Sequence, residues 1–277
     1  MSHDRIPLAG VIGSPVAHSR SPQLHAHWLK TLGIRGFYIP MDVSEADLET
    51  VLRTLPRMGF RGVNITVPHK EKALMLADMV SDRATIIGAA NTLVFREDGR
   101  IQADNTDGYG FTENLRHGAP DWQPQSGPAA VLGAGGAARA VIAALLDAGV
   151  PEVLLSNRTR VRAETLQSQF GRRVTVIDWV QAGNMLEEAV TVVNTTTLGM
   201  VGNAPLRVPL DGLRKGAVVT DLVYAPLQTR LLIEAEKAGC VTVDGLGMLL
   251  HQAVPGFERW FGARPEVDAA ARAAALR

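Results

Sequence analysis

A glycine-rich segment near the middle of the chain, GAGGAARA at 133–140, limits the possible folds more than any other feature. It follows an apolar, strand-like run and opens an apolar run with helical periodicity, the context in which G-x-G-x-x-G/A is informative. Gly133 permits a tight turn, Gly135 lets the backbone approach a pyrophosphate, and Ala138 lets helix and strand pack closely. The segment therefore predicts a dinucleotide-binding turn. The alternative is an ordinary tight turn between a strand and a helix.

Strand-like and helical segments alternate along the chain in two series, separated by a Pro- and Gln-rich stretch at 118–128 that we expect to be a surface loop. This alternation is typical of parallel sheets covered by helices. We therefore predict an α/β protein with two lobes and a small-molecule site in the cleft between them. The predicted strands are 7–13, 37–43, 62–67, a hairpin over 91–103 with its turn at Asp98 and Gly99, 129–135, 153–157, 173–177, 191–196, 217–223 and 240–244. The predicted helices are 22–32, 45–55, 69–87, 107–116, 136–148, 160–170, 228–238, 247–261 and an Ala-rich C-terminal helix over 268–277.

The composition excludes several classes of function. Lys and Arg number 28, and Asp and Glu also number 28, so the formal net charge is zero and gives no support to a nucleic-acid partner. The single cysteine, Cys240, excludes an intramolecular disulfide and a cysteine zinc site, and we expect it to be buried and unreactive. At roughly 150 residues per domain, a chain of 277 residues favours two domains.

Neither the N-terminus nor the long uncharged stretch 189–206 indicates a membrane protein. The N-terminal apolar stretch is short and interrupted by Pro7, Gly10 and Gly13, which makes it a poor signal peptide. Segment 189–206 contains Asn, Thr and Pro residues and lacks the character of a membrane-spanning helix. We therefore expect a cytoplasmic protein without a membrane partner.

The segment after the second predicted strand of the second series is strongly basic. Residues 156–173 contain five arginines and one acidic residue, Glu164. An NAD-specific site would place Asp or Glu near the end of this strand, to bind the ribose 2′-hydroxyl. The pattern instead favours a 2′-phosphate, and so NADP, held by charge-assisted hydrogen bonds. The alternative is a solvated basic face. The candidate ligands of the 2′-phosphate are Asn157, Arg158, Thr159 and Arg162.

Four segments of the first series carry polar residues where a buried strand would not. Together with five segments of the second half of the chain, they resemble the shikimate dehydrogenase family, of the NADP-dependent kind found in aromatic amino-acid biosynthesis. The resemblance covers nearly the whole chain, and nine motifs in one order are highly specific. The motifs are GSPVAHSRSP (13–22), NITVPHK (64–70), GAANT (88–92), DNTDGYG (104–110), GAGGAAR (133–139), NRTxxR (157–162), NTTTLGM (194–200), DLVYAPLQT (221–229) and GLGMLLHQA (245–253).

The resemblance implies an enzyme that reversibly reduces 3-dehydroshikimate to shikimate with NADPH. It also implies an N-terminal α/β substrate lobe, a Rossmann-like NADP-binding lobe, and C-terminal helices that return to the first lobe. On this basis we place residues 1–106 and 246–277 in the substrate-binding catalytic domain and residues 107–245 in the NADP-binding domain. Monomer and homodimer both fit the sequence.

Hydride addition to a ketone leaves an alkoxide that must gain a proton, so this reaction needs an acid/base group. By resemblance the group is Lys70, which follows a predicted strand end, and its partner is Asp107. For Lys70 the alternative is a surface lysine at the start of a helix. For Asp107 the alternative is that it binds a substrate hydroxyl and orients Lys70.

The resemblance places further hydrogen-bonding side chains on the substrate. Ser19 and Ser21 would bind its carboxylate at the start of a helix near Pro22, where Ser21 could alternatively act only as the helix cap. The alternative for the remaining residues is turn or strand-end chemistry, which is strongest for Asn64 and Asn91. The side chains that would bind the carboxylate or the hydroxyls are Asn64, Thr66, Asn91, Tyr224 and Gln252.

The cofactor contacts implied by the resemblance lie mainly in the second half of the chain. Leu222 and Gly245 would line the nicotinamide, with the segment NTTTLGM beneath it. Asp82 occupies an acidic position sometimes linked to the cofactor in this family, and a carboxylate on a helix surface is the alternative. The residues of the glycine-rich turn that would bind the cofactor are Gly133, Ala134, Gly135, Gly136 and Ala137.

Histidines supply one departure from the family and no metal site. His69 stands where many relatives carry Phe, so it either tunes the neighbouring Lys70 or packs as an ordinary histidine. His25 and His27 would point apart on a helix, and we expect no bound metal.

Two other functions remain as alternatives. One is a relative that uses quinate or accepts NAD, against which Ser19 with Ser21 and the NRTxxR motif argue. The other is a non-catalytic regulator that senses NADP, which would have no need for both Lys70 and Asp107.

Overall fold

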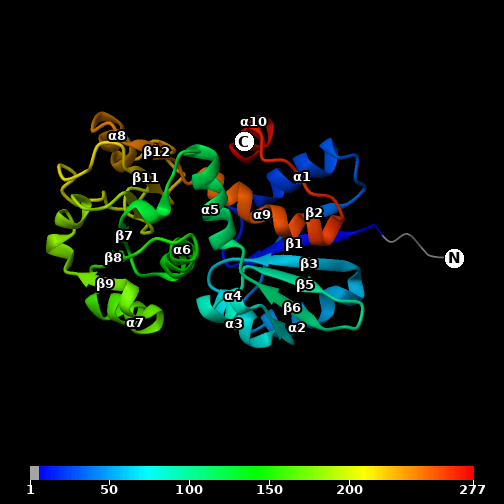
Figure 1. The fold of residues 1–277 in the computed structure, drawn as a ribbon. Helices are drawn as coiled ribbons and strands as arrows, with labels where there is room; N and C mark the ends of the chain where they lie inside the picture. The colour runs from blue at the N-terminus through cyan, green and yellow to red at the C-terminus, as the bar shows by residue number, and fades with distance from the viewer. Residues whose placement is uncertain (1–5) are drawn as a thin grey trace. The chain divides into compact units, whose positions relative to one another are not determined.

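The computed structural model describes residues 6–277, which form two compact units, each with its own six-stranded sheet (Figure 1). The first unit runs to Thr106 and resumes at Leu250, and the second runs from Asp107 to Leu249. The second crossing lies inside helix α9 (Leu246–Phe261), beyond the predicted boundary at 245/246. The first turn of α9 packs within the second unit, where Met248 contacts the buried core, and this moves the boundary along the chain.

The sheet of the first unit has the strand order β2-β1-β3-β5-β6-β4. β1 pairs in parallel with β2 and β3, whereas β5 pairs antiparallel with both β3 and β6. The sheet is therefore mixed, because the predicted hairpin turns the chain back at Gly99, which has a positive φ of 82° that suits glycine. The strands are β1 (Leu8–Gly13), β2 (Phe37–Asp42), β3 (Phe60–Ile65), β4 (Met79–Val80), β5 (Thr92–Phe95) and β6 (Ile101–Asp104).

The prediction of one helix over 69–87 is wrong, because a short strand divides this segment. α3 (Lys70–Leu76) ends before β4, and α4 (Asp82–Ile87) begins after it. β4 forms because the backbone N–H groups of Asp78 and Ser81 donate to carbonyls of β6. The Ser81 hydroxyl then caps α4 by accepting from the N–H of the third residue of that helix at 3.2 Å.

The sheet of the second unit has the order β12-β11-β10-β7-β8-β9, and all of its strand pairs are parallel. Read from β9, this is the 3-2-1-4-5-6 order of dinucleotide-binding folds. The direction of strand addition reverses between β7 and β10, and ligands of such sheets bind there, at the carboxyl ends of the strands. The predicted Rossmann-like fold of this lobe is confirmed. The strands are β7 (Ala129–Leu132), β8 (Val153–Ser156), β9 (Val174–Ile177), β10 (Thr191–Asn194), β11 (Val218–Asp221) and β12 (Val241–Val243).

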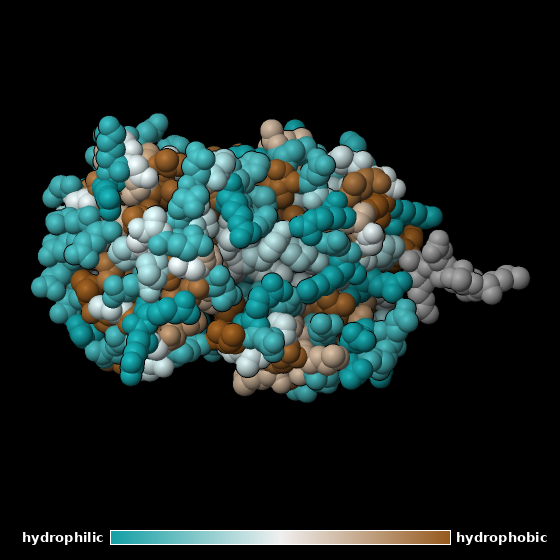
Figure 2. Space-filling view, viewed as in Figure 1, coloured by the Kyte–Doolittle hydropathy of each residue, from teal (hydrophilic) through white to brown (hydrophobic). Residues whose placement is uncertain are grey.

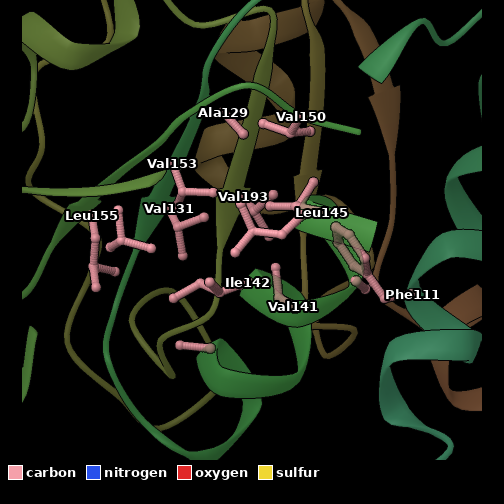
Figure 3. Close-up of a cluster of buried hydrophobic side chains, with 14 of the residues drawn as sticks. Phe111, Ala129, Val131, Val141, Ile142, Leu145, Val150, Val153, Leu155 and Val193 are labelled. Atoms are coloured by element: carbon pink, nitrogen blue, oxygen red, sulfur yellow. The ribbon is translucent and has the colours of Figure 1, made fainter. Parts of the chain in front are cut away.

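A core of mainly aliphatic side chains forms around β7, α5 (Asp107–Gly118) and α6 (Gly136–Asp147) (Figure 3). All four residues of β7 are buried, as expected for a strand covered on both faces. Val131 of β7, Val193 of β10 and Phe111 of α5 belong to this one cluster. The packing fixes the start of α6 against the end of β7. Further helices of this unit are α7 (Arg160–Phe170) and α8 (Arg230–Lys237).

The C-terminal helices return to the first unit from Leu250 onward, as predicted. Trp260 of α9 donates from Nε1 to the Leu93 carbonyl at 3.0 Å, and its indole occupies the space that a side chain at Gly62 would need. Trp28 donates in the same way to the Glu266 carbonyl at 3.0 Å. The remaining helices of this unit are α1 (Ser21–Thr31), α2 (Leu48–Thr54) and α10 (Ala269–Ala275).

Hydrophilic side chains cover most of the face seen in Figure 2, and the apolar residues on it occur in small groups. Across residues 6–277, no helix combines the length and the apolar composition that crossing a bilayer requires.

Candidate active site

The glycine-rich turn joins β7 to α6. It lies where the order of strand addition reverses in the parallel sheet of the second unit. Gly133 has a positive φ of 106°, and a Cβ there would lie 2.6 Å from Thr195 Oγ1, so glycine alone fits without strain. Beside Gly135 and Gly136, in contrast, no neighbouring heavy atom lies within 4 Å of a Cβ position. Thr195 therefore fills the space beside Gly133, whereas the space beside Gly135 and Gly136 is open.

The N-terminus of α6 opens directly from this turn. Gly135 is its N-cap, and no side chain caps the twelve-residue helix. The first N–H groups of a helix have no partner within the helix, and the helix dipole favours an anion beside them. Ala138 is fully buried, which permits the close packing of helix and strand. The open glycines and the uncapped helix end provide what a pyrophosphate requires.

Asn157 ties the end of β8 to the same turn. Its Oδ1 accepts from the Ala134 N–H at 3.2 Å, and its Nδ2 donates to the Thr159 carbonyl at 2.8 Å. The amide therefore holds the basic segment beside the glycine-rich turn through backbone groups.

The arginines of the basic segment have different surroundings. Arg160 pairs with Glu164 at 2.7 Å and also with Asp178. Arg158 and Arg162 are exposed, and neither forms an ion pair within the described residues. The charge of Arg160 is thus already neutralised by the fold, whereas Arg158 and Arg162 have the positive charge that a 2′-phosphate requires.

On the other side of the turn, the carboxyl ends of β10 and β11 are joined by buried polar groups. Asn194 Nδ2 donates to Asp221 Oδ1 at 2.9 Å, and the Thr229 hydroxyl donates to Oδ2 at 2.7 Å. Burial raises the pKa of Asp221, although these hydrogen bonds oppose the shift. A Cβ at Gly245 would lie 2.5 Å from the Leu222 carbonyl, so the fold brings these two predicted nicotinamide contacts together.

In the first unit, amide and hydroxyl groups form a network at the ends of the interior strands β3, β5 and β6. Asn64 Nδ2 donates to the Asn91 carbonyl at 3.1 Å and to Thr92 Oγ1 at 3.2 Å. Asn91 Nδ2 donates to Thr106 Oγ1 at 3.0 Å and to Gln252 Oε1 at 3.2 Å. The fold therefore joins three predicted substrate ligands, Asn64, Asn91 and Gln252, that are far apart in the sequence.

Ser19 and Ser21 lie at the start of α1, and Thr66 lies between β3 and α3. The alternative that Ser21 caps α1 is wrong, since the N-cap is Arg20 and no side chain caps this helix. Instead, the Ser21 N–H donates to Ser19 Oγ at 3.3 Å, because Ser21 is already the first helical residue. Ser21 is buried, whereas Ser19 and Thr66 are half-buried.

Lys70 is the first residue of α3 and is half-buried. Its carbonyl accepts from the Ala90 N–H at 2.9 Å. The preceding residue, His69, is fully buried, and its Nε2 lies 2.7 Å from the Val43 carbonyl. A carbonyl only accepts, so Nε2 carries the proton. His69 is therefore a packed histidine that fastens the start of α3.

The other predicted residues occupy separate places. Asp107 begins α5 and the second unit, and Tyr224 follows β11 in that same unit, half-buried. Asp82 is exposed in the first turn of α4, where a helix favours a carboxylate without any ligand. The prediction that Cys240 is buried is wrong: it is half-buried just before β12, because the edge strand leaves this end uncovered, and its partial burial raises the pKa of the thiol.

Three members of the network in the first unit were not predicted. Thr92 and Thr106 lie inside the motifs GAANT and DNTDGYG, so the sequence contained a signal for them. Tyr38 lies in an ordinary strand pattern, and its Oη donates to Asn64 Oδ1, 26 residues away, at 2.7 Å. No local pattern reveals such a long-range contact.

Comparisons with known proteins find shikimate dehydrogenases along nearly the whole chain. Residues 11–93 match the shikimate dehydrogenase substrate binding domain, residues 123–200 match shikimate/quinate 5-dehydrogenase, and residues 245–275 match the shikimate 5′-dehydrogenase C-terminal domain. Shikimate dehydrogenase (NADP(+)) of Cereibacter sphaeroides is 71% identical over 274 residues, which are 99% of this chain and 98% of that protein.

Two solved structures share the fold over nearly their full length. The shikimate 5-dehydrogenase of Thermus thermophilus, in complex with NADP(H) and shikimate, has a TM-score of 0.86 at 40% identity, covering 98% of this chain and 99% of that one. The quinate dehydrogenase of Corynebacterium glutamicum, in complex with NAD, has a TM-score of 0.90 at 34% identity, with the same coverage of 98% and 99%.

Two features define a two-domain oxidoreductase. One is the sheet of the second unit, with the strand order of dinucleotide-binding folds and an open glycine turn, and the other is the polar network of the first unit. The chain belongs to the shikimate dehydrogenase family. The resemblance inferred from the nine motifs is thereby confirmed, and with it the prediction of an oxidoreductase.

Proposed function

We propose that this chain catalyses the reversible, NADPH-dependent reduction of 3-dehydroshikimate to shikimate. The first unit binds the substrate, and the second unit binds NADP. The observation that carries the proposal is the polar network of Asn64, Asn91 and Gln252 at the ends of the interior strands of the first unit. It stands in a chain 71% identical to a protein named for this reaction and this cofactor.

The second unit suits NADP in three respects. The open backbone at Gly135 and Gly136 and the uncapped start of α6 fit the pyrophosphate. Arg158 and Arg162 fit the 2′-phosphate, since both are exposed and neither pairs with an acid among residues 6–277. When bound, NADPH supplies the hydride that reduces the ketone carbon. The other residues proposed to contact it are Ala134, Ala137, Asn157, Thr159, Leu222 and Gly245.

Lys70 performs the proton transfer. As the ketone carbon gains hydride, its oxygen gains negative charge, and the Lys70 ammonium donates a proton to that oxygen. In the reverse direction the neutral amine removes the proton from the substrate hydroxyl. Asp107 is the partner of Lys70: it binds a substrate hydroxyl and orients Lys70. The proton that Lys70 gives up is replaced from water.

Further polar side chains hold the substrate. Ser19 and Ser21, at the start of α1, bind the carboxylate, which the positive end of a helix also favours. A substrate with several hydroxyls is recognised by fixed polar groups, because an analogue lacking a hydroxyl leaves a buried partner unsatisfied. Asn64, Thr66, Asn91, Tyr224 and Gln252 complete the set, and Asp82 is left as an exposed helix-start carboxylate.

The proposal is tested by following the absorbance of reduced nicotinamide with the purified protein, using shikimate or quinate with NADP or NAD. Turnover fastest with shikimate and NADP is expected. Preference for quinate and NAD, the ligands named for the Corynebacterium protein's activity and complex, would contradict the assignment of Arg158. Tight NADP binding without turnover of any pair would favour a regulator that senses NADP.

A further inference from the structure

Tyr38 of β2 is a buried tyrosine whose hydroxyl contacts a proposed substrate ligand. Its side chain is almost enclosed, with the residue 7% exposed, and Oη donates to Asn64 Oδ1 at 2.7 Å. Burial raises the pKa of Tyr38, although a hydrogen bond with Ser21 opposes the shift. The phenol therefore keeps its proton at neutral pH and acts as a donor.

The other end of the Asn64 amide fixes the polarity of this contact. Nδ2 lies 3.1 Å from the Asn91 carbonyl and 3.2 Å from Thr92 Oγ1. A backbone carbonyl only accepts, so Nδ2 must face Asn91 and Oδ1 must face Tyr38. Both N–H groups of Asn64 are then occupied within the protein. What the amide offers a ligand is the second lone pair of Oδ1, which is an acceptor.

His25 of α1 holds the tyrosine ring in place. The two rings are stacked with centroids 3.7 Å apart and planes inclined by 8°, and Trp28 packs edge-on against the imidazole at 5.5 Å. His25 is fully buried, and neither ring nitrogen has a hydrogen-bond partner among the described residues. The imidazole therefore does not compete with Asn64 for the phenol proton.

We propose that Tyr38, held by the stacked His25, is a positioning residue that orients the Asn64 amide with its oxygen as the free acceptor. Asn64 is thereby committed to a hydroxyl of the substrate, which can donate, and not to the carboxylate, which cannot. This inference rests on the proposed function, because it assumes that Asn64 contacts the substrate.

The test begins with Tyr38→Phe, which keeps the ring and its stack but removes the donor. We expect the KM for shikimate to rise about tenfold, the change that corresponds to about 1.4 kcal/mol. The KM for NADP and kcat should change less than twofold, on the order of the scatter between such measurements. The inhibition constant of cyclohex-1-ene-1-carboxylate, a ring acid without hydroxyls, should change less than the KM for shikimate, because this ligand has no hydroxyl for Asn64 to bind.

A matched control and a second background make the test specific. Trp122→Phe removes a buried hydrogen bond of the second unit, to Thr191 Oγ1, and should leave the KM for shikimate unchanged. In an Asn64→Ala background, Tyr38→Phe should have no further effect on this KM, because Tyr38 acts through Asn64.

The proposal is overturned by an unchanged KM for shikimate in Tyr38→Phe, by additive effects of the two substitutions, or by an equal loss of cyclohexene carboxylate binding. Wild-type turnover separates this inference from the function on which it rests. If the wild type oxidises shikimate and Tyr38→Phe has no effect, the inference alone fails. If the wild type does not oxidise shikimate, the proposed function fails as well.

Discussion

Asn157, at the end of β8, accepts a hydrogen bond from the backbone N–H of Ala134 at 3.2 Å, across 23 residues of sequence. This contact joins the turn that suits a pyrophosphate to the segment that carries the arginines. Both proposed phosphate sites therefore lie on the paired neighbouring strands β7 and β8 of the second unit.

Arg158→Ala is expected to raise the KM for NADP at least tenfold more than the KM for NAD. One charge-assisted hydrogen bond contributes about 1.5–3 kcal/mol, and about 1.4 kcal/mol corresponds to a tenfold change. Steady-state kinetics with both cofactors measure the difference. Arg160→Ala is the matched control, because Arg160 is neutralised by Glu164 and Asp178 and should change the two constants equally. Equal effects of Arg158→Ala on both cofactors would remove the 2′-phosphate assignment.

Lys70→Ala is expected to lower kcat by roughly 10²–10⁴, the usual range for a lost acid/base group, with a smaller change in the KM for shikimate. Lys72→Ala provides the control on the same helix, since Lys72 is engaged with the Glu45 carbonyl and has no assigned part in the reaction. Turnover close to wild type in Lys70→Ala would exclude the proposed proton transfer.

His25 makes the stability of the first unit depend on pH. Burial lowers the pKa of His25 to about 3, from an ordinary value of 6.5. Below pH 6.5 the unfolded imidazole takes up a proton that the folded one does not. The contribution of His25 to the free energy of unfolding is therefore fully present above pH 6.5. Between pH 6.5 and pH 3 it falls by up to about 1.4 kcal/mol per pH unit.

Urea unfolding of wild type and His25→Phe between pH 4 and pH 7 measures this slope, and the variant should show a shallower one. His18→Phe is the matched control for the loss of an exposed histidine. An unchanged slope in His25→Phe would mean that His25 takes up a proton in the folded protein as readily as in the unfolded one.

His69→Phe is expected to destabilise the protein by about 1–3 kcal/mol, because it leaves the buried Val43 carbonyl without its donor. Denaturant unfolding measures this loss. The kcat of the folded variant should remain within about threefold of wild type, as expected for a packing residue that makes no contact with the reacting atoms. A large fall in kcat with unchanged stability would instead support tuning of Lys70.

Long patterns in the sequence predicted most elements, because burial on both faces and helical periodicity leave a local record. The division of 69–87 was missed, since β4 depends on carbonyls of β6, which come later in the chain. The Ser81 cap, however, is a local signal that marks the start of α4. In the polar network of the first unit, Asn64, Asn91 and Gln252 were predicted because they lie within motifs. Thr92 and Thr106 also lie within motifs but were not singled out, and Tyr38 lies outside every motif.

The sequence by itself determined the alternation of strands and helices, the glycine turn at Gly133 and the family. Each of these depends on residues that are neighbours along the chain or on motifs in a fixed order. The tertiary structure decided which charges and protons are available. Asp178 neutralises Arg160, and the Asn91 carbonyl sets which end of Asn64 faces Tyr38. The available charge or proton of a side chain is set by its partners in space, and these come from distant parts of the chain.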